Sequence, residues 1–128
     1  MTGTTPGGPV AHILVIDDDE EICRMLQELL SSEGHEVDIA NGGQEGIDHY
    51  RRLPSDLVIT DIFMPEKDGL DAIRELRSQR SDVKIIAITG FPVGQRQGYL
   101  ELAEDLGAAR TFTKPFDTRA LVEAVREL

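Results

Sequence analysis

One stretch of the chain reads Leu57-Val58-Ile59-Thr60-Asp61-Ile62-Phe63-Met64-Pro65-Glu66-Lys67-Asp68-Gly69, an apolar run that leads into an acidic residue. A short apolar run bounded by Pro54 and Pro65 is typical of a buried β-strand. The pattern therefore predicts Asp61 at the carboxyl end of that strand, on the edge where open parallel α/β sheets bind their ligands. A single Asp after a strand is more often a cap or turn residue, so its role depends on what the rest of the chain brings to it.

Similar runs recur along the chain and alternate with helical patterns. Further strands are predicted at Ile13 to Ile16, Val37 to Ala40, Lys84 to Ile88 and Ala109 to Thr113. Helical spacing of apolar residues predicts helices that carry Ile22 to Leu29, Gln44 to Leu53, Leu70 to Leu76, Tyr99 to Leu106 and Asp117 to Leu128. In the first helix the inward face is predicted to be Ile22, Met25, Leu26 and Leu29. Strict alternation of strand and helix predicts a parallel sheet with helices on both faces.

Composition limits the class of protein. The chain has 128 residues and a formal net charge of −11, which argues against direct binding to nucleic acid or to an anionic membrane. Cys23 is the one cysteine, so an internal disulfide is excluded. The single cysteine is typical of a reducing compartment, so a cytoplasmic location is expected. The sequence also has no apolar run long enough to span a membrane and no signal-peptide pattern. Residues 1–10 are predicted to be a disordered tail, and residues 11–128 the one domain.

Polar side chains follow four of the five predicted strands. Asp17 and Asp18 end the first strand, Asp61 the third, Thr89 the fourth and Lys114 the fifth. Carboxyl ends of parallel strands share one edge, so these groups should converge. Carboxylates packed together raise one another's pKa unless a cation joins them, and oxygen ligands of this kind suit Mg²⁺.

Other kinds of site find no support. His12, His35 and His49 are scattered in the sequence and suggest no zinc site, and Walker-type or dinucleotide-binding glycine loops are absent. A carboxylate facing Mg²⁺, Lys and Thr is suited to attack phosphorus and form an aspartyl phosphate.

The pattern resembles the receiver domain of two-component response regulators. The likeness runs from about Ala11 to the end of the chain, and its motifs are Asp17-Asp18, Asp61-x-x-Met64-Pro65-x-x-Asp68-Gly69, Thr89-Gly90 and Lys114-Pro115-Phe116. The resemblance implies a CheY-like (βα)5, flavodoxin-like doubly wound sheet of five parallel strands.

The resemblance also implies roles for single residues. Asp61 would be the phosphoacceptor, with Thr89 and Lys114 holding the phosphoryl group. Asp18 would bind Mg²⁺ directly and Asp17 through water, while Asp61 and the backbone carbonyl of Phe63 complete the protein ligands. The Lys114–Pro115 bond would be cis.

The implied function is a phosphorylation-dependent signalling switch in a two-component phosphorelay. The donor would be a phosphohistidine on a sensor histidine kinase or a histidine phosphotransfer protein. The output would be a downstream protein target or an output domain, with no direct contact to nucleic acid or membrane, and the resemblance leaves open a homodimer on phosphorylation. Such a domain catalyses its own phosphorylation and dephosphorylation and is not an enzyme acting on an external metabolite. With about a dozen residues after Lys114, no output domain is expected within the sequence given.

Two features depart from the family's usual pattern, and a further pair of residues bears on the lifetime of the phosphoryl group. Thr111 stands where the family commonly has Tyr or Phe, and period-2 alternation puts Phe112 on the other side of the strand. The segment from Thr89 to Gly107 is longer than usual, which predicts a non-standard output face. Phe63 and Phe91 flank the expected path of the attacking water, and ordinary rim packing or a long-lived phosphoryl group would explain them equally well.

Three rival functions remain. A haloacid-dehalogenase-like phosphohydrolase would place a second Asp two residues after the nucleophile, where this chain has Phe63. A flavodoxin-like binding module would need a phosphate-binding loop after the first strand. A degenerate receiver that only docks partners is disfavoured by the full set of acidic, hydroxyl and lysine groups.

Overall fold

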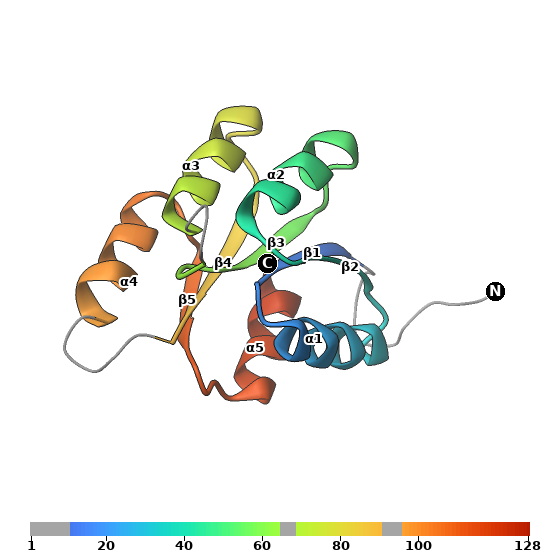
Figure 1. Ribbon diagram of the computed structural model, residues 1–128. Helices are drawn as coiled ribbons and strands as arrows, with labels where there is room; N and C mark the ends of the chain where they lie inside the picture. Colours follow the sequence, from blue (N-terminus) through green and yellow to red (C-terminus); the bar gives the residue numbers. More distant parts are fainter. Residues whose placement is uncertain (1–10, 65–68, 91–95) are drawn as a thin grey trace.

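The chain folds around one parallel β-sheet whose strands alternate strictly with helices (Figure 1). The computed structural model describes residues 11–64, 69–90 and 96–128, and for residues 96–100 it describes the backbone alone. In chain order the elements are β1 (His12–Ile16), α1 (Glu20–Ser32), β2 (Glu36–Ala40), α2 (Gly43–Arg52), β3 (Leu57–Asp61), α3 (Gly69–Gln79), β4 (Lys84–Thr89), α4 (Arg96–Asp105), β5 (Arg110–Thr113) and α5 (Thr118–Glu127). The predicted (βα)5 order is confirmed, and the tail at residues 1–10 lies outside the described residues.

The order of the strands across the sheet is β2-β1-β3-β4-β5, and every neighbouring pair is parallel. All carboxyl ends therefore open on the same edge of the sheet. The register pairs Ile16 with Thr60, so the residues that follow β1 lie beside the end of β3. Thr89 pairs with Thr113, which brings Lys114 next to the end of β4.

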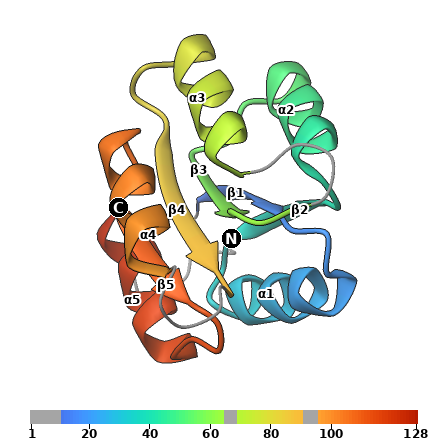
Figure 2. The same cartoon turned by 60° about the vertical axis from the view of Figure 1, so that its left-hand side comes forward.

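Two apolar cores lie on opposite faces of the sheet, and Figure 2 shows the helices on both sides of it. Leu14 and Ile16 of β1 face the core beneath α2, α3 and α4. Ile13 and Val15 face the core beneath α1 and α5. Because both faces are covered, the strands are continuous apolar runs rather than alternating ones, as the sequence indicated.

The helix ends follow local chemistry. Asp19 caps α1 by accepting hydrogen bonds from the backbone N–H groups of Glu21 and Ile22, and Asp117 caps α5 in the same way. Gly34 follows α1 with a φ of 96°, a left-handed conformation that favours glycine at a helix end.

The predicted face of α1 packs against the core, but it is only part of the apolar surface of the helix. The fully buried residues are Cys23, Leu26 and Leu30, and the other three predicted residues are partly buried against the same core: Ile22, Met25 and Leu29. The reason is that α1 packs on two surfaces at once. Leu29 lines a cavity with Thr118 and Val122 of α5, so one strip of α1 faces the sheet and the adjacent strip faces α5.

An arginine joins the carboxyl-terminal ends of α3 and α4. Arg77 of α3 donates from Nη2 to the carbonyl of Gly107 and from Nη1 to the carbonyl of Ser81. Gly107 has a φ of 113°, and a Cβ atom there would lie 2.4 Å from Nε of Arg77. Glycine at 107 therefore serves both the helix end and the contact with Arg77.

Candidate functional site

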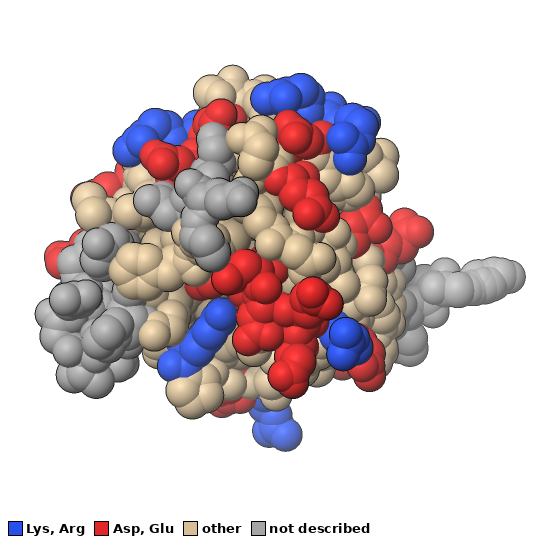
Figure 3. All heavy atoms as spheres, in the orientation of Figure 1, with Lys and Arg blue, Asp and Glu red and all other residues tan. Residues whose placement is uncertain are grey.

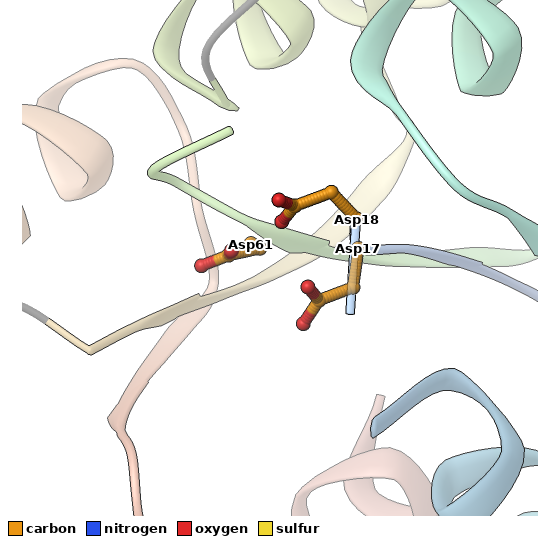
Figure 4. A group of neighbouring side chains, drawn as sticks. All are labelled: Asp17, Asp18 and Asp61. Carbon is orange, nitrogen blue, oxygen red and sulfur yellow. The ribbon is translucent and has the colours of Figure 1, made fainter. Parts of the chain in front are cut away.

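The predicted polar groups meet at the carboxyl edge of the sheet. Asp17 and Asp18 follow β1, and Asp61 is the last residue of β3. Each of these three offers a carboxylate oxygen, and the oxygens all lie within 4.8 Å of one another. Figure 4 shows the three side chains projecting into the same region from the ends of the two strands. Within the described part of the chain, this is the one group of three or more such side chains compact enough to hold a metal ion.

Asp17 is buried and held by two donors. Its side chain accepts a hydrogen bond from the backbone N–H of Asp19 at 2.9 Å, and its Oδ2 accepts one from Nζ of Lys114 at 2.9 Å. Burial raises the pKa of Asp17, and these two hydrogen bonds oppose the rise. The two hydrogen bonds therefore hold the Asp17 carboxylate in place, although burial disfavours its charged form. In this position it can hold Lys114.

Asp61 is the least satisfied carboxylate of the site. It is 5% exposed, and its Oδ1 has no hydrogen-bond partner. Burial raises its pKa to about 7, and the negative charge of Asp17 adds to the rise while Lys114 opposes it. A buried carboxylate oxygen without a donor is costly, so the arrangement calls for a cation or a ligand at this point.

Lys114 provides the positive charge of the site. Its Nζ lies 2.9 Å from Oδ2 of Asp17 and 3.5 Å from Oδ2 of Asp61. Burial lowers the pKa of Lys114, but the hydrogen bonds and charges of the two aspartates outweigh burial and raise it. The backbone N–H of Lys114 donates to the carbonyl of Thr89 at 2.7 Å, and the predicted cis bond to Pro115 is present.

Thr89 is fully buried, and its Oγ1 has no hydrogen-bond partner. It is the last residue of β4, next to the Lys114 segment. A buried hydroxyl without a partner is uncommon, and this one stands on the same edge as the unpartnered oxygen of Asp61. The two groups could both be satisfied by one polar ligand bound at the edge.

Asp18 and Phe63 are the solvent-facing members of the predicted set. Asp18 is exposed, unlike Asp17 and Asp61. The side chain of Phe63 is among the large apolar groups at the surface, 40% exposed. Phe91 and the Pro65–Asp68 part of the predicted motif lie outside the described residues, as does much of the long segment predicted after Thr89.

Two supporting residues were not recognised from the sequence. A Cβ atom on Gly69 would lie 2.1 Å from the carbonyl oxygen of Asp61, so α3 can begin this close to β3 only with glycine. This contact explains why glycine stands at position 69. Cys23 donates from Sγ to the carbonyl of Asp17 at 3.2 Å. Burial raises the pKa of its thiol to about 12, so it stays protonated.

The aromatic residue of β5 lies where alternation predicts it. Thr111 pairs with Ala87, which faces the core of α2, α3 and α4. Phe112 packs instead with the core beneath α1 and α5. Phe112 therefore cannot replace an aromatic residue at position 111 without a change in the strand.

Acidic side chains extend beyond the three site aspartates. Figure 3, in the orientation of Figure 1, shows them gathered over the carboxyl ends of β1 and β3 and the start of α1. Asp18, Asp19, Glu20 and Glu21 are consecutive and exposed. The edge therefore presents a negative surface that favours cations and basic partners.

Comparisons with known proteins agree on one family. A model of the response regulator receiver domain matches residues 13–126. The transcriptional regulatory protein PdtaR of Mycobacterium tuberculosis is 37% identical over 129 residues, which is 98% of this chain and 61% of PdtaR. The chemotaxis protein CheY of Thermotoga maritima is 34% identical over 118 residues, covering 91% of this chain and 96% of CheY.

Solved structures of receiver domains have the same fold as this chain. A CheY-like receiver domain protein from Methanospirillum hungatei superimposes with a TM-score of 0.85 at 28% identity, covering 93% of each chain. Several of the matched regulators are longer: this chain spans about half to three fifths of their length. In the part of the chain that the structure describes, no helix is both long and apolar enough to cross a membrane.

Proposed function

This chain belongs to the response regulator receiver domain family of two-component systems, and we propose that Asp61 is its phosphoacceptor. The observation that carries the proposal is the pair of unpartnered buried groups, Oδ1 of Asp61 and Oγ1 of Thr89, on an edge that also holds Lys114. A phosphoryl group on Asp61 would give the hydroxyl an acceptor and would give Lys114 an anionic partner in place of the Asp61 carboxylate.

The acidic cluster fits a divalent cation. Asp17, Asp18 and Asp61 bring three negative charges when ionised, and Lys114 offsets one, which leaves an excess that one divalent ion would neutralise. Hard oxygen ligands favour Mg²⁺, which binds through few protein groups and keeps several waters. The residues proposed to hold it are Asp18 and Asp61 directly, Asp17 through water, and the backbone carbonyl of Phe63. Bound there, the ion would neutralise charge on the phosphoryl oxygens.

Each residue of the site would have its own role in phosphoryl transfer. A carboxylate oxygen of Asp61 attacks the phosphorus of a phosphohistidine, the P–O bond forms as the N–P bond breaks, and the electron pair returns to the imidazole nitrogen. Lys114, already 3.5 Å from Asp61, would stabilise the transferred oxygens. Thr89 would donate a hydrogen bond from its hydroxyl to the same group, while Asp17 keeps Lys114 in place. The domain would in this way catalyse its own phosphorylation and no reaction of an external metabolite.

The partners follow from this chemistry. A sensor histidine kinase or a phosphotransfer protein in the cytoplasm would supply the phosphoryl group, and a protein target or an attached output domain would read the change. Direct contact of this domain with nucleic acid is disfavoured by its net charge of −11. Relatives named as transcriptional regulators are longer than this chain, so that activity is theirs as whole proteins.

Intact mass after incubation with Mg²⁺ and a small phosphodonor tests the proposal. We expect a single phosphoryl adduct on the wild type, none on Asp61→Asn, and none on either protein in EDTA. Asp48→Asn, which changes an exposed carboxylate of α2, is the matched control and should be phosphorylated like the wild type. No adduct on the wild type would favour the alternative of a receiver that only docks partners.

A further inference from the structure

A cleft of about 230 Å³ opens at the amino-terminal edge of the sheet, at the opposite end of the strands from the carboxyl edge. It lies between the loop that joins α2 to β3 and the loop that joins α3 to β4. The first residues of these strands, Leu57 and Lys84, pair in the sheet, so the two loops are neighbours. The polar residues that line the cleft are Tyr50, Ser55, Asp56, Arg80, Asp82 and Lys84.

Tyr50 brings a hydroxyl without a protein partner to this cleft. The residue is 1% exposed, and its ring is buried in the core beneath α2, α3 and α4. Burial raises the pKa of Tyr50, while Arg80 opposes the rise and Asp82 and Asp56 add to it. These three charged residues all line the cleft, so the hydroxyl faces it. No hydrogen bond joins the hydroxyl to another described residue, whereas a buried tyrosine usually has such a partner.

The charged groups around the hydroxyl are two cations and two carboxylates, none of them tightly paired. Nε of Arg80 lies 3.7 Å from Oδ1 of Asp82, and both side chains are more than half exposed, so this ion pair is weak. Asp56 uses one oxygen to accept from a backbone N–H of β1, and Lys84 donates to a backbone carbonyl just past α5. Both cations therefore keep free donors, and both carboxylates keep a free oxygen.

This arrangement favours a ligand that carries both charges. A simple anion would be repelled by the two carboxylates, and a simple cation would be repelled by Arg80 and Lys84. A carboxylate group can pair with the guanidinium of Arg80 and accept from the Tyr50 hydroxyl, while an ammonium group can pair with Asp56. The cleft is smaller than the pockets of about 300 to 1,000 Å³ that hold drug-sized molecules, so the ligand must be small.

We propose that this cleft binds a small amino acid as its zwitterion. The bound molecule would join the loop before β3 to the loop before β4. Lys84 begins β4 and Thr89 ends it, and a strand of this length spans roughly 16 Å, so the cleft is separate from the carboxyl edge. Amino acid binding and phosphorylation can therefore be measured independently.

Titration of nitrogen-labelled protein with L-alanine, followed by backbone amide NMR, tests the proposal. We expect a Kd of about 1 mM or tighter, with shifts of the amide signals of Ser55 and Val83, which line the cleft. Propanoate and ethylammonium are L-alanine without its ammonium group and without its carboxylate. Each should bind at least about tenfold more weakly than L-alanine, because each loses one of the two ion pairs.

Variants then locate the site. Tyr50→Phe removes only the hydroxyl and should weaken L-alanine binding about fivefold, whereas Arg80→Gln should weaken it at least about tenfold. Arg74→Gln is the matched control, because Arg74 is an exposed arginine of α3 outside the cleft. Asp61→Asn should bind L-alanine like the wild type, although it lacks the proposed phosphoacceptor.

The proposal is overturned if L-alanine shifts no amide signal at the cleft, or if propanoate or ethylammonium binds as tightly as L-alanine. It is also overturned if folded Tyr50→Phe or folded Arg80→Gln binds L-alanine as tightly as the wild type. The comparison of L-alanine with propanoate and ethylammonium uses the wild type alone, so a poorly folded variant does not weaken the test.

Discussion

Two carboxylates on the same sheet, Asp61 and Asp38, differ in burial, in hydrogen-bond partners and in the direction of their pKa shift. At the carboxyl edge, Asp61 is 5% exposed, has an oxygen with no partner, and has a pKa raised to about 7, chiefly by burial. Against α2, Asp38 is 37% exposed, accepts from two imidazoles, and has a lowered pKa. Partnering thus lowers the pKa of Asp38, whereas burial without full partnering raises that of Asp61. The unsatisfied region is the one where a ligand has most to gain.

The largest effect on the carboxyl edge is expected from Gly69→Ala. The new Cβ would stand 2.1 Å from the carbonyl oxygen of Asp61 and 2.6 Å from Cα of Ile62, so backbone must move. We expect a loss of about 3 kcal/mol in unfolding free energy and a large loss of phosphorylation. Denaturant unfolding and phosphodonor labelling measure the two effects.

Gly42→Ala is the control for that change. A Cβ atom there meets nothing within 4 Å, so stability should change by less than about 0.5 kcal/mol. Equal effects of the two substitutions would show that contact with β3 is not what requires glycine at 69.

Removing the charge of Asp61 should stabilise the metal-free protein. Its pKa is about 7 in the folded state against an ordinary 3.8, so the folded state disfavours the carboxylate. This penalty is full above pH 7, shrinks as pH falls toward 4 and is absent below that value. In EDTA at pH 8 we expect Asp61→Asn to be more stable than the wild type by about 2 kcal/mol, as measured by urea unfolding.

The same pair of proteins at pH 4 provides the control. There the difference should be much smaller, because the wild-type carboxyl is protonated in the folded state and about half protonated in the unfolded state. A variant less stable than the wild type at pH 8 would mean that Lys114 satisfies Asp61 fully in the absence of an ion.

Asp38→Asn should lower the stability of the metal-free protein, in contrast to Asp61→Asn. The lowered pKa of Asp38 means that its carboxylate contributes stability above the ordinary value of 3.8, which is lost as pH falls through the lowered folded value. Because the group is more than a third exposed, the loss in EDTA at pH 7 should be under about 1 kcal/mol. Urea unfolding at pH 7 and pH 3 measures it, with Asp48→Asn as the exposed control on α2. A gain in stability would contradict the contrast between the two regions.

The smallest expected effect concerns the exposed Phe63 beside the phosphoacceptor. If its ring hinders water at the phosphoryl group, Phe63→Asn should speed dephosphorylation by about threefold or more, which corresponds to about 0.7 kcal/mol in the barrier. Decay of the phosphorylated mass gives the rate, and Leu53→Asn, at another exposed apolar residue, is the control. An unchanged rate would leave ordinary rim packing as the role of Phe63.

Much of the fold follows from local signals in the sequence. The strands are continuous apolar runs because both faces of the sheet are covered, and Asp19 and Asp117 begin helices through short-range hydrogen bonds. The convergence of Asp17, Asp61 and Lys114 could be predicted because parallel strands share an edge. The residue roles at that edge remain predictions until phosphorylation is measured.

Other features depend on how distant elements pack. The shared contacts of His12 and His49 with Asp38 need the register of β1 with β2 and the height of α2 above the sheet, neither of which a spacing in the sequence specifies. The apolar strip of α1 extends beyond the predicted face to Cys23 and Leu30, because α5 covers part of this helix and the strip is wider than a sheet contact alone requires.

Arg77 has a consequence for how this domain could move. Its guanidinium, on α3, donates to the carbonyl of Gly107, which directly follows α4. The carboxyl-terminal end of α4 is therefore held against α3, whereas its amino-terminal end follows the segment after Thr89. This contact restrains the carboxyl-terminal end of α4 directly, so a shift of the helix would be smallest there. Loss of the Arg77 side chain would remove that restraint.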